Sequence, residues 1–362
     1  MQLNTNKEDL LQILTAAFKA VPAKTSFPIM ESFLLEVKDD AVTATATDGA
    51  MTIVASASAQ GEGKACINAK MLLDAVTLLP DGDIAITTDE NTVTVNYGNG
   101  KFSLPAMPAE DFPDVNIPLS FEGVSIPKDN LKAALGYVIP SIAKDAMRPQ
   151  LCGVYFNPIK GGYDLVSSDS RTLSLEYIPC DGNAGDFVLS APAVTFLRGA
   201  LKGEDMVTFS TNDTTVTFQF DDILLNVVKV VGTFPKYQTV MPRGGGNTLV
   251  APTADFLGAV KRVATCANKA SNSIKFDLDQ LVGAVIEAQD LGFGCAAKEE
   301  APYVKYEGEK MTIGFKHDLL TALIAATDAD EVTLAIDNPK KAVLITTANE
   351  NRKAIIMPVA VV

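Results

Sequence analysis

The sequence predicts an α+β fold in which one unit of helices and antiparallel strands is repeated three times. Three observations predict this class: similar helical segments recur after 121 and then 125 positions, segments with period-two alternation follow them, and short turns separate those segments. The chain has 362 residues, which is enough for two or three domains with a sizeable core. We therefore expect three domains of similar architecture.

A helix is expected near the start of each unit, at 7–18, 128–135 and 253–260. In the first segment Leu10 and Leu14 share one helical face, and each segment carries Asp or Glu in its first turn, where the helix dipole favours negative charge. Second helices are expected later in each unit, beginning near Lys70, Pro192 and His317. Proline suits a first helical position.

Between and after the helices, residue types alternate as they do in half-buried antiparallel strands, for example at 41–47, 92–95 and 215–218. A step that contains Asp interrupts a strand pair in each unit, at Asp48, Asp169 and Asp290. The expected domains are 1–121, 122–246 and 247–362, with linkers near 105–123 and 236–250. The alternative is three unrelated α+β domains, but the matching order and period in all three units count against it.

Composition and missing motifs exclude much enzyme chemistry. The chain has one histidine, His317, and no HExxH, GxSxG, Walker A or helix-opening GxGxxG pattern. The acidic turn at 328–331 lacks EF-hand spacing, so we expect a solvated turn and no metal or other cofactor. Five widely spaced cysteines without a CxxC pair predict free, mostly buried thiols: Cys66, Cys152, Cys180, Cys266 and Cys295.

The chain is 47% hydrophobic and 20% charged, which is typical of an ordinary globular protein. No apolar run approaches the roughly 20 residues that a membrane span needs. The segment 1–7 lacks a basic stretch followed by an apolar one, which predicts no signal peptide and a cytoplasmic location.

The net charge of −14 is unevenly distributed. Over the six expected helices we count ten basic residues: Lys7, Lys19, Lys70, Lys128, Lys132, Arg198, Lys202, Lys261, Arg262 and Lys316. Six acidic residues oppose them: Glu8, Asp9, Asp74, Asp129, Asp255 and Asp318. The helices thus carry +4 and the remainder −18, which predicts a helical surface that meets a polyanion. The alternative is that lysine and arginine are simply good helix formers.

The chain resembles the β sliding clamp family of bacterial DNA polymerase III over essentially all of its length. The resemblance depends on a set of short matches in the family's order: 102–113, 151–153, 168–173, 232–237, 313–315 and 355–358. It implies a head-to-tail homodimer that closes a ring of six domains around duplex DNA, with the helices inside, the sheets outside and no enzymatic activity.

The resemblance and the helix faces together imply two sets of contact residues. The expected DNA-binding residues are Lys24, which matches a basic position of the family, and Lys70, Lys132, Arg198, Lys202, Lys261 and Arg262. The expected dimer contacts are Phe102, Leu104, Thr265 and Cys266.

In this family the replicative polymerase, the clamp loader and other partners insert a short hydrophobic peptide between the second and third domains. The expected cleft residues are Leu151, Thr172, Leu173, Pro235, Val240, Leu319, Ile355, Met357 and Pro358. The family's usual Asp-Gly-His-Arg is Asp-Ser-Arg-Thr at 169–172 here, Thr239 replaces an arginine near the cleft, and the final residues 359–362 lack the usual basic residue. The peptide preference is therefore expected to differ.

Two other functions are compatible with parts of the sequence. A triplicated surface or adhesion module would need a secretion signal and would be monomeric and indifferent to DNA. A hydrolase would need a carboxylate pair such as Asp169 and Glu176, but no sequence motif positions a nucleophile for this pair. We therefore expect a processivity factor.

Overall fold

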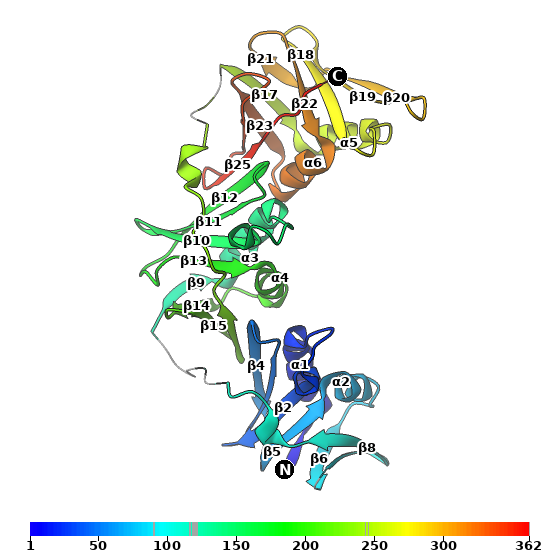
Figure 1. Cartoon of the computed structure of the whole chain (residues 1–362), viewed down its shortest axis with the longest axis vertical. Helices are drawn as coiled ribbons and strands as arrows, with labels where there is room; N and C mark the ends of the chain where they lie inside the picture. Colours follow the sequence, from blue (N-terminus) through cyan, green and yellow to red (C-terminus); the bar gives the residue numbers. More distant parts are fainter. Residues whose placement is uncertain (90, 116, 118–121, 243, 245, 362) are drawn as a thin grey trace. The chain divides into compact units, whose positions relative to one another are not determined.

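The computed structural model describes residues 1–361 except 90, 116, 118–121, 243 and 245 (Figure 1). Residue 121, the predicted end of the first domain, and residues 243 and 245 of the second predicted linker lie outside the described residues. None of the described helices is both long enough and apolar enough to cross a bilayer.

The order of elements within the described residues repeats three times. Each third of the chain has a strand, a helix, four strands, a helix and three strands, and the last third adds the short strand β21.

The first third contains β1 (Gln2–Asn6), α1 (Lys7–Ala17), β2 (Ser32–Lys38), β3 (Ala41–Thr47), β4 (Met51–Ser58), β5 (Gln60–Asn68), α2 (Ala69–Thr77), β6 (Asp83–Asp89), β7 (Thr92–Tyr97) and β8 (Gly100–Met107). The second contains β9 (Val124–Pro127), α3 (Lys128–Val138), β10 (Gly153–Ile159), β11 (Gly162–Ser168), β12 (Thr172–Pro179), β13 (Phe187–Ser190), α4 (Ala191–Ala200), β14 (Met206–Thr211), β15 (Thr215–Phe220) and β16 (Ile223–Val228). The third contains β17 (Asn247–Pro252), α5 (Thr253–Ala264), β18 (Ser273–Asp279), β19 (Gly283–Asp290), β20 (Cys295–Ala301), β21 (Lys305–Glu307), β22 (Met311–Lys316), α6 (His317–Ala326), β23 (Glu331–Ile336), β24 (Val343–Thr346) and β25 (Arg352–Ile356).

The three Asp-containing steps form the same turn in each repeat. The carboxylate of Asp48 accepts hydrogen bonds from the backbone N–H groups two and three residues ahead. Asp169 and Asp290 do the same at the equivalent turns, β11–β12 and β19–β20. Asp favours such turns because its short side chain reaches its own backbone. The predicted equivalence of these steps is confirmed.

Two compact units make up the chain, and they do not coincide with the repeats. Unit 1 comprises Met1–Lys128, Gly182–Ala184 and Gly199–Lys229, and unit 2 comprises Asp129–Asp181, Gly185–Arg198 and the chain from Val230 onward. The second repeat is shared between the units because its strands pair with both of its neighbours. The division into three domains at 121 and 246 stays a prediction.

Unit 1 is built on a twelve-stranded sheet in the order β1-β6-β7-β8-β5-β2-β3-β4-β16-β15-β14-β9. The antiparallel pair β4–β16, with Leu225 opposite Ile53, joins the first repeat to the second by main-chain hydrogen bonds. Helices α1 and α2 lie together against one side of the strands β2 to β5 of the first repeat (Figure 1). Leu10, Leu14 and Leu72 of these helices are buried.

Unit 2 contains a nine-stranded sheet in the order β13-β10-β11-β12-β25-β24-β23-β17-β21 and a four-stranded sheet in the order β20-β19-β18-β22. The pair β12–β25 joins the second repeat to the third. A buried ion pair reinforces this junction, because the guanidinium of Arg352 on β25 donates to the carboxylate of Glu176 on β12 at 3.0 Å. Arg352 also donates to the carbonyl of Thr327 and lies over the ring of Tyr137.

Two predictions about single residues are wrong. Cys266 and Cys295 are not free thiols but form a disulfide, with Cα atoms 5.4 Å apart, because the fold brings the end of α5 to the start of β20. The other three cysteines are free, and burial raises the pKa of the Cys66 thiol to about 11. Lys128, counted as a helix-surface cation, is buried in unit 1 with an exposed fraction of 1%, where it pairs with Asp221 and with Asp205 at 3.5 Å.

Replacing Lys128 with Ala is expected to lower the free energy of unfolding by about 2–4 kcal/mol, because it removes a buried stem and both ion pairs. Urea unfolding measures the change. Lys38→Ala is the matched control, since Lys38 is exposed and its pair with Asp39 is solvated. Equal losses in the two variants would contradict the assignment of Lys128 as a buried anchor.

Candidate nucleic-acid and partner-binding surfaces

Six of the seven cations predicted to contact DNA have no carboxylate partner within 4.0 Å in the described part of the chain: Lys24, Lys70, Lys132, Arg198, Lys202 and Lys261. Lys132 is half-buried and the others are exposed. Lys24 lies in a loop and Lys202 follows α4, and the helices that carry the other four cations bury the opposite face, as Phe256 and Val260 of α5 and Leu197 of α4 show. The predicted core-facing and solvent-facing sides of α2, α4 and α5 are confirmed.

Two helical glycines lie directly beneath arginine side chains in unit 2. A Cβ atom at Gly136 of α3 would lie 3.3 Å from Nε of Arg198, and one at Gly258 would lie 3.0 Å from a terminal nitrogen of Arg262. The missing side chains let these guanidinium groups approach the helix backbone closely. Arg198 therefore has a defined position on the exposed surface of α3 and α4.

Arg262 differs from the other predicted DNA contacts. Its Nε and Nη2 atoms bond both carboxylate oxygens of Glu299 on β20, at 3.0 and 2.5 Å. This pairing raises the pKa of the Arg262 guanidinium and lowers the pKa of Glu299. Because its charge is neutralised within the chain, Arg262 is a weaker candidate for a phosphate contact than Lys261 beside it.

The predicted surplus of +4 on the helices is too large. Within their observed bounds the helices contain seven basic and six acidic residues, a net charge of +1. Lys19, Lys202 and Lys316 lie just beyond the helix ends, where the first follows α1, the second follows α4 and the third precedes α6. The helical elements therefore contribute scattered cations rather than a strongly positive surface.

Part of the predicted cleft gathers into an apolar cluster in unit 2. We call it the β10–β12 cluster, and its buried members are Leu151, Val166, Leu173, Val188, Phe234, Tyr237 and Ile355. Half-buried apolar side chains pack against it, including Tyr155, Leu175, Val230, Met241 and Leu344. The pairing of β12 with β25 brings the second and third repeats together here, because it sets Leu173 opposite Ile355.

Hydrogen bonds hold the aromatic members of the cluster in place. The hydroxyl of Tyr237 donates to the carboxylate of Asp164 at 2.5 Å and accepts from the amide of Asn157 at 2.8 Å. Burial raises the pKa of Asp164, and the bond from Tyr237 partly offsets this rise. The rings of Tyr155 and Phe234 stack with centroids 4.8 Å apart. These contacts give the cluster a fixed aromatic side.

Exposed apolar side chains lie close in sequence to members of the cluster. Met147 and Val231 have exposed fractions of 89% and 84%, and Val240 and Met357 are also exposed. Two hydrogen bonds fix the loops near this rim: Arg148 donates to Ser170, and the N–H of Met357 donates to the carbonyl of Arg171. A buried apolar cluster with an exposed apolar rim is suited to a hydrophobic peptide.

The nine predicted cleft residues differ in their placement. Leu151, Leu173 and Ile355 belong to the cluster. Thr172 is buried beside it, with its hydroxyl bonded to Asp169. The others lie outside the buried cluster: Pro235, Val240 and Met357 are exposed, and Leu319 and Pro358 are half-buried.

The sequence reasoning missed several residues of the cluster. Phe234 and Tyr237 lie in the quoted segment 232–237, so a signal for them was present. Val166 and Val188 lie on strands β11 and β13 and have no local feature that separates them from other core valines.

The predicted dimer contacts lie on or beside strands with an open edge. Phe102 and Leu104 are half-buried on β8, which over Gly100–Pro105 pairs with β7 alone among the described strands. Thr265 is exposed at the end of α5, and Cys266 is bonded to Cys295 at the start of β20. Strand β20 is itself an outer strand, which among the described strands pairs only with β19.

The two carboxylates of the alternative hydrolase site both have structural partners. Asp169 accepts bonds from the backbone and hydroxyl of Thr172, and Glu176 is buried against Arg352. No group of three metal-ligating side chains occurs among the residues described.

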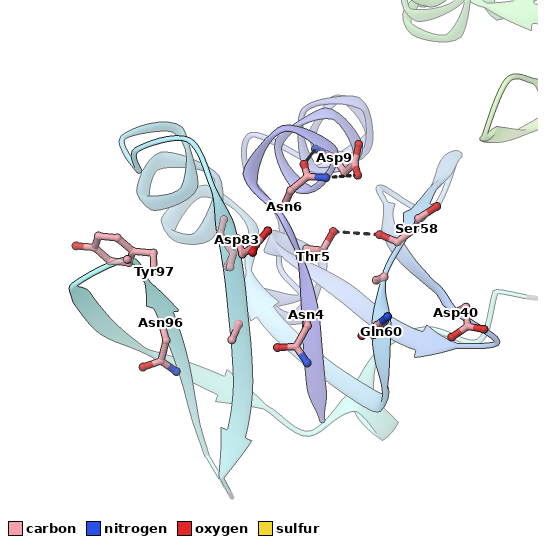
Figure 2. Close-up of a pocket in the computed structure, with 14 residues that line it drawn as sticks. Asn4, Thr5, Asn6, Asp9, Asp40, Ser58, Gln60, Asp83, Asn96 and Tyr97 are labelled. Carbon is pink, nitrogen blue, oxygen red and sulfur yellow. Dashed lines mark hydrogen bonds between the residues drawn. The ribbon is translucent and has the colours of Figure 1, made fainter.

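A polar cavity of about 830 Å³ lies on the sheet of unit 1 (Figure 2), and its lining residue Tyr97 packs against the predicted dimer contact Phe102, with ring centroids 6.0 Å apart. Strand register sets Asn96, Ala85 and Asn4 side by side on β7, β6 and β1, with Gln60 of β5 next to Asn4. Its lining consists mainly of amide, hydroxyl and carboxylate groups, and it shares no residue with either candidate surface.

The threefold repeat of helices and antiparallel strands is the fold of a DNA sliding clamp. Residues 1–118 match the family model of the DNA polymerase III beta subunit, N-terminal domain, and residues 238–360 match that of its C-terminal domain. The beta sliding clamp of Synechocystis sp. is 26% identical, with all of both chains covered.

Solved structures agree with this classification at the level of the fold. The sliding clamp of Bacillus subtilis is 20% identical with a TM-score of 0.95, and covers all of both chains. The Caulobacter crescentus clamp, solved with polyethylene glycol bound to a putative beta-motif tethering region, is 24% identical with a TM-score of 0.93 over all of both chains. The chain belongs to the DNA polymerase III beta subunit family, the beta sliding clamps. The predicted fold class and the predicted function as a sliding clamp are confirmed.

Replacing Tyr237 with Phe is expected to lower the free energy of unfolding by about 1–2 kcal/mol, because Asp164 loses its phenol donor. The loss should be smaller at low pH, because protonated Asp164 needs that donor less. Urea unfolding at two pH values measures both effects. Tyr177→Phe is the control, since its hydroxyl bonds the carbonyl of Gly161 at an exposed site. Equal losses in both variants would contradict this role for Tyr237.

Proposed function

We propose that two copies of this chain close head to tail into a ring around duplex DNA and act as a processivity factor without enzymatic activity. The observation that carries the proposal is the pair of open strand edges, β8 in the first repeat and β20 in the third, beside the residues that the family resemblance assigns to the dimer contact. Pairing of unlike edges from two chains satisfies both edges and closes a ring with twofold symmetry.

The proposed ring has three domains in each chain, at 1–121, 122–246 and 247–362, with the helices toward DNA. Lys24, Lys70, Lys132, Arg198, Lys202 and Lys261 contact phosphates, and Arg262 contributes less because Glu299 neutralises it. Contacts of this kind are independent of sequence and weaken with salt. A closed ring stays on DNA without tight contacts, so a small positive surplus is sufficient.

The β10–β12 cluster and its rim are the proposed docking site for a short hydrophobic peptide from the replicative polymerase, the clamp loader and other partners. The exposed Val240 and Met357 offer apolar surface at the rim, and Leu151, Leu173 and Ile355 form the base. The beta-motif tethering region named for the C. crescentus clamp supports a peptide site in this fold. The proposed location is the cytoplasm, where a replication clamp meets chromosomal or other DNA.

Sedimentation at micromolar concentration is expected to give twice the mass of one chain, because the β8 and β20 edges pair between copies. A Pro substitution at Ser103 or Ala297 should shift the protein toward monomer, since proline adds a ring and removes a backbone donor from the pairing strand. A wild-type protein that stays monomeric or forms a trimer would contradict the proposed ring.

Replacing Lys132, Arg198, Lys202 and Lys261 together with Ala is expected to shorten the lifetime of the clamp on a nicked circle. The dependence of log affinity on log salt should become shallower by about 0.9 for each phosphate that is no longer neutralised by a cation. Arg262→Ala is the matched control and should have a smaller effect. An unchanged salt dependence in the fourfold variant would show that these side chains do not face DNA.

Deleting 357–362 is expected to abolish binding of a hydrophobic partner peptide while the dimer persists. Fluorescence anisotropy with a labelled peptide measures binding, and sedimentation checks the dimer. The point variant Val240→Glu should also weaken binding, because it places a charge at an apolar rim. Leu281→Glu is the control, since Leu281 is an exposed leucine at the β18–β19 turn. Full binding in both rim variants would place the peptide elsewhere.

A further inference from the structure

The outer strand β20 is fastened to α5 by side-chain links along its length. A disulfide joins Cys295 to Cys266, which lies near the C-terminal end of α5. Glu299 accepts two hydrogen bonds from Arg262, which lies four residues before Cys266. Arg262 lies in the last turn of α5 and Cys266 lies in the turn that follows the helix, so both links start from the same end of α5. The disulfide therefore fixes the start of β20, and the ion pair fixes its middle.

The disulfide also supports the β19–β20 hairpin tip. The tip carries Leu291 and Phe293, with exposed fractions of 85% and 81%, and a glycine follows each of them, Gly292 and Gly294. Two other contacts hold the tip: Asp290 caps its turn and accepts a hydrogen bond from Asn268. When the disulfide is broken, the hairpin tip keeps the hydrogen bond from the amide of Asn268 to the carboxylate of Asp290. The tip contains two glycines and two exposed apolar side chains.

We propose that Cys266 and Cys295 are a thiol–disulfide exchange site that sets how firmly the ring closes, with a dithiol protein of the thioredoxin class as the exchange partner. This inference rests on the proposed dimer, because β20 is one of the two edges that pair between copies. Both cysteines are partly exposed in the single chain, so an exchange partner can reach them while the β20 edge is unpaired. In reducing compartments disulfides are usually transient, catalytic or sensing rather than structural.

The exchange reaction balances without another reagent. To reduce the Cys266–Cys295 disulfide, a thiolate of the partner attacks one of its sulfur atoms and forms a mixed disulfide. The second thiolate of the partner then attacks that mixed disulfide and releases the clamp's dithiol. Two electrons and two protons pass from the partner to the clamp, and the partner leaves as a disulfide. The same steps in reverse, with an oxidised partner, form the disulfide again.

The oxidised and reduced states differ in the order of the β20 edge. In the oxidised state the disulfide holds the first residue of β20 against α5, so the edge is pre-organised for pairing. In the reduced state the start of β20 and the tip with Leu291 and Phe293 are held less firmly, and pairing has to order them first. Oxidation therefore strengthens ring closure, and reduction favours opening.

The first measurement tests the exchange site in the full-length chain. The variant C66A/C152S/C180S, which retains only the pair in question, is incubated with oxidised thioredoxin, quenched, alkylated and digested for mass spectrometry. Cys266 and Cys295 are expected to be protected from alkylation as one disulfide-linked peptide pair, and to become alkylated after reduced thioredoxin is added. Full alkylation of both cysteines in the oxidised sample would overturn the proposal.

The second measurement tests ring closure. Isotope-labelled and unlabelled dimers of the same variant are mixed, and native mass spectrometry follows subunit exchange. Exchange is expected to be roughly tenfold faster in the reduced state, which corresponds to about 1.4 kcal/mol. Adding C295S should give the fast rate under both conditions. Equal rates in the oxidised and reduced states would overturn the regulatory role even if the disulfide forms.

The two proposals fail in different ways. A chain that sediments as a monomer in both redox states overturns the proposed ring and with it the control of ring closure, whereas the alkylation result still decides whether the exchange site exists. A dimer with no redox-dependent protection of Cys266 and Cys295 leaves the ring in place and overturns the exchange site alone.

Discussion

Main-chain pairing across repeat boundaries is the constraint on which the rest of the structure depends. A strand edge with unpaired N–H and C=O groups has to be paired, covered or solvated. In this chain β4 pairs with β16 and β12 pairs with β25, so the sheets run from one repeat into the next. Several sheet edges among the described strands are open in the single chain, and those of β8 and β20 are the two proposed to pair with a second copy.

The same pairing creates the proposed partner-binding surface. Because β12 lies beside β25, Leu173 and Ile355 from different repeats meet in one cluster, and Arg352 binds Glu176 across the same junction. The surface proposed to face DNA is only weakly positive, since the helices carry a net charge of only +1 within their observed bounds. A clamp that encloses DNA is retained by the closed ring, so its cations need to attract the phosphates only weakly.

Much of the fold could be predicted because patterns of residues close in sequence indicate the elements of each repeat. Helix starts, alternating strands and the turns at Asp48, Asp169 and Asp290 depend on residues close in sequence. The burial of Lys128 could not be predicted, because its partners Asp205 and Asp221 lie far along the chain. The pairing of Cys266 with Cys295 likewise depends on tertiary contact. Most of the exposed cations could be read from helix faces, but the neutralisation of Arg262 required the position of Glu299 on β20.

The most direct test of the account is whether the clamp is held on DNA by topology. The dimer is loaded on a singly nicked circular duplex at moderate salt, and the circle is then cut with a restriction enzyme. The protein is expected to stay on the intact circle and to leave the linear product by sliding off its ends, unless the ends are blocked. Equal retention on the circular and the linear DNA would contradict enclosure and would indicate ordinary surface binding.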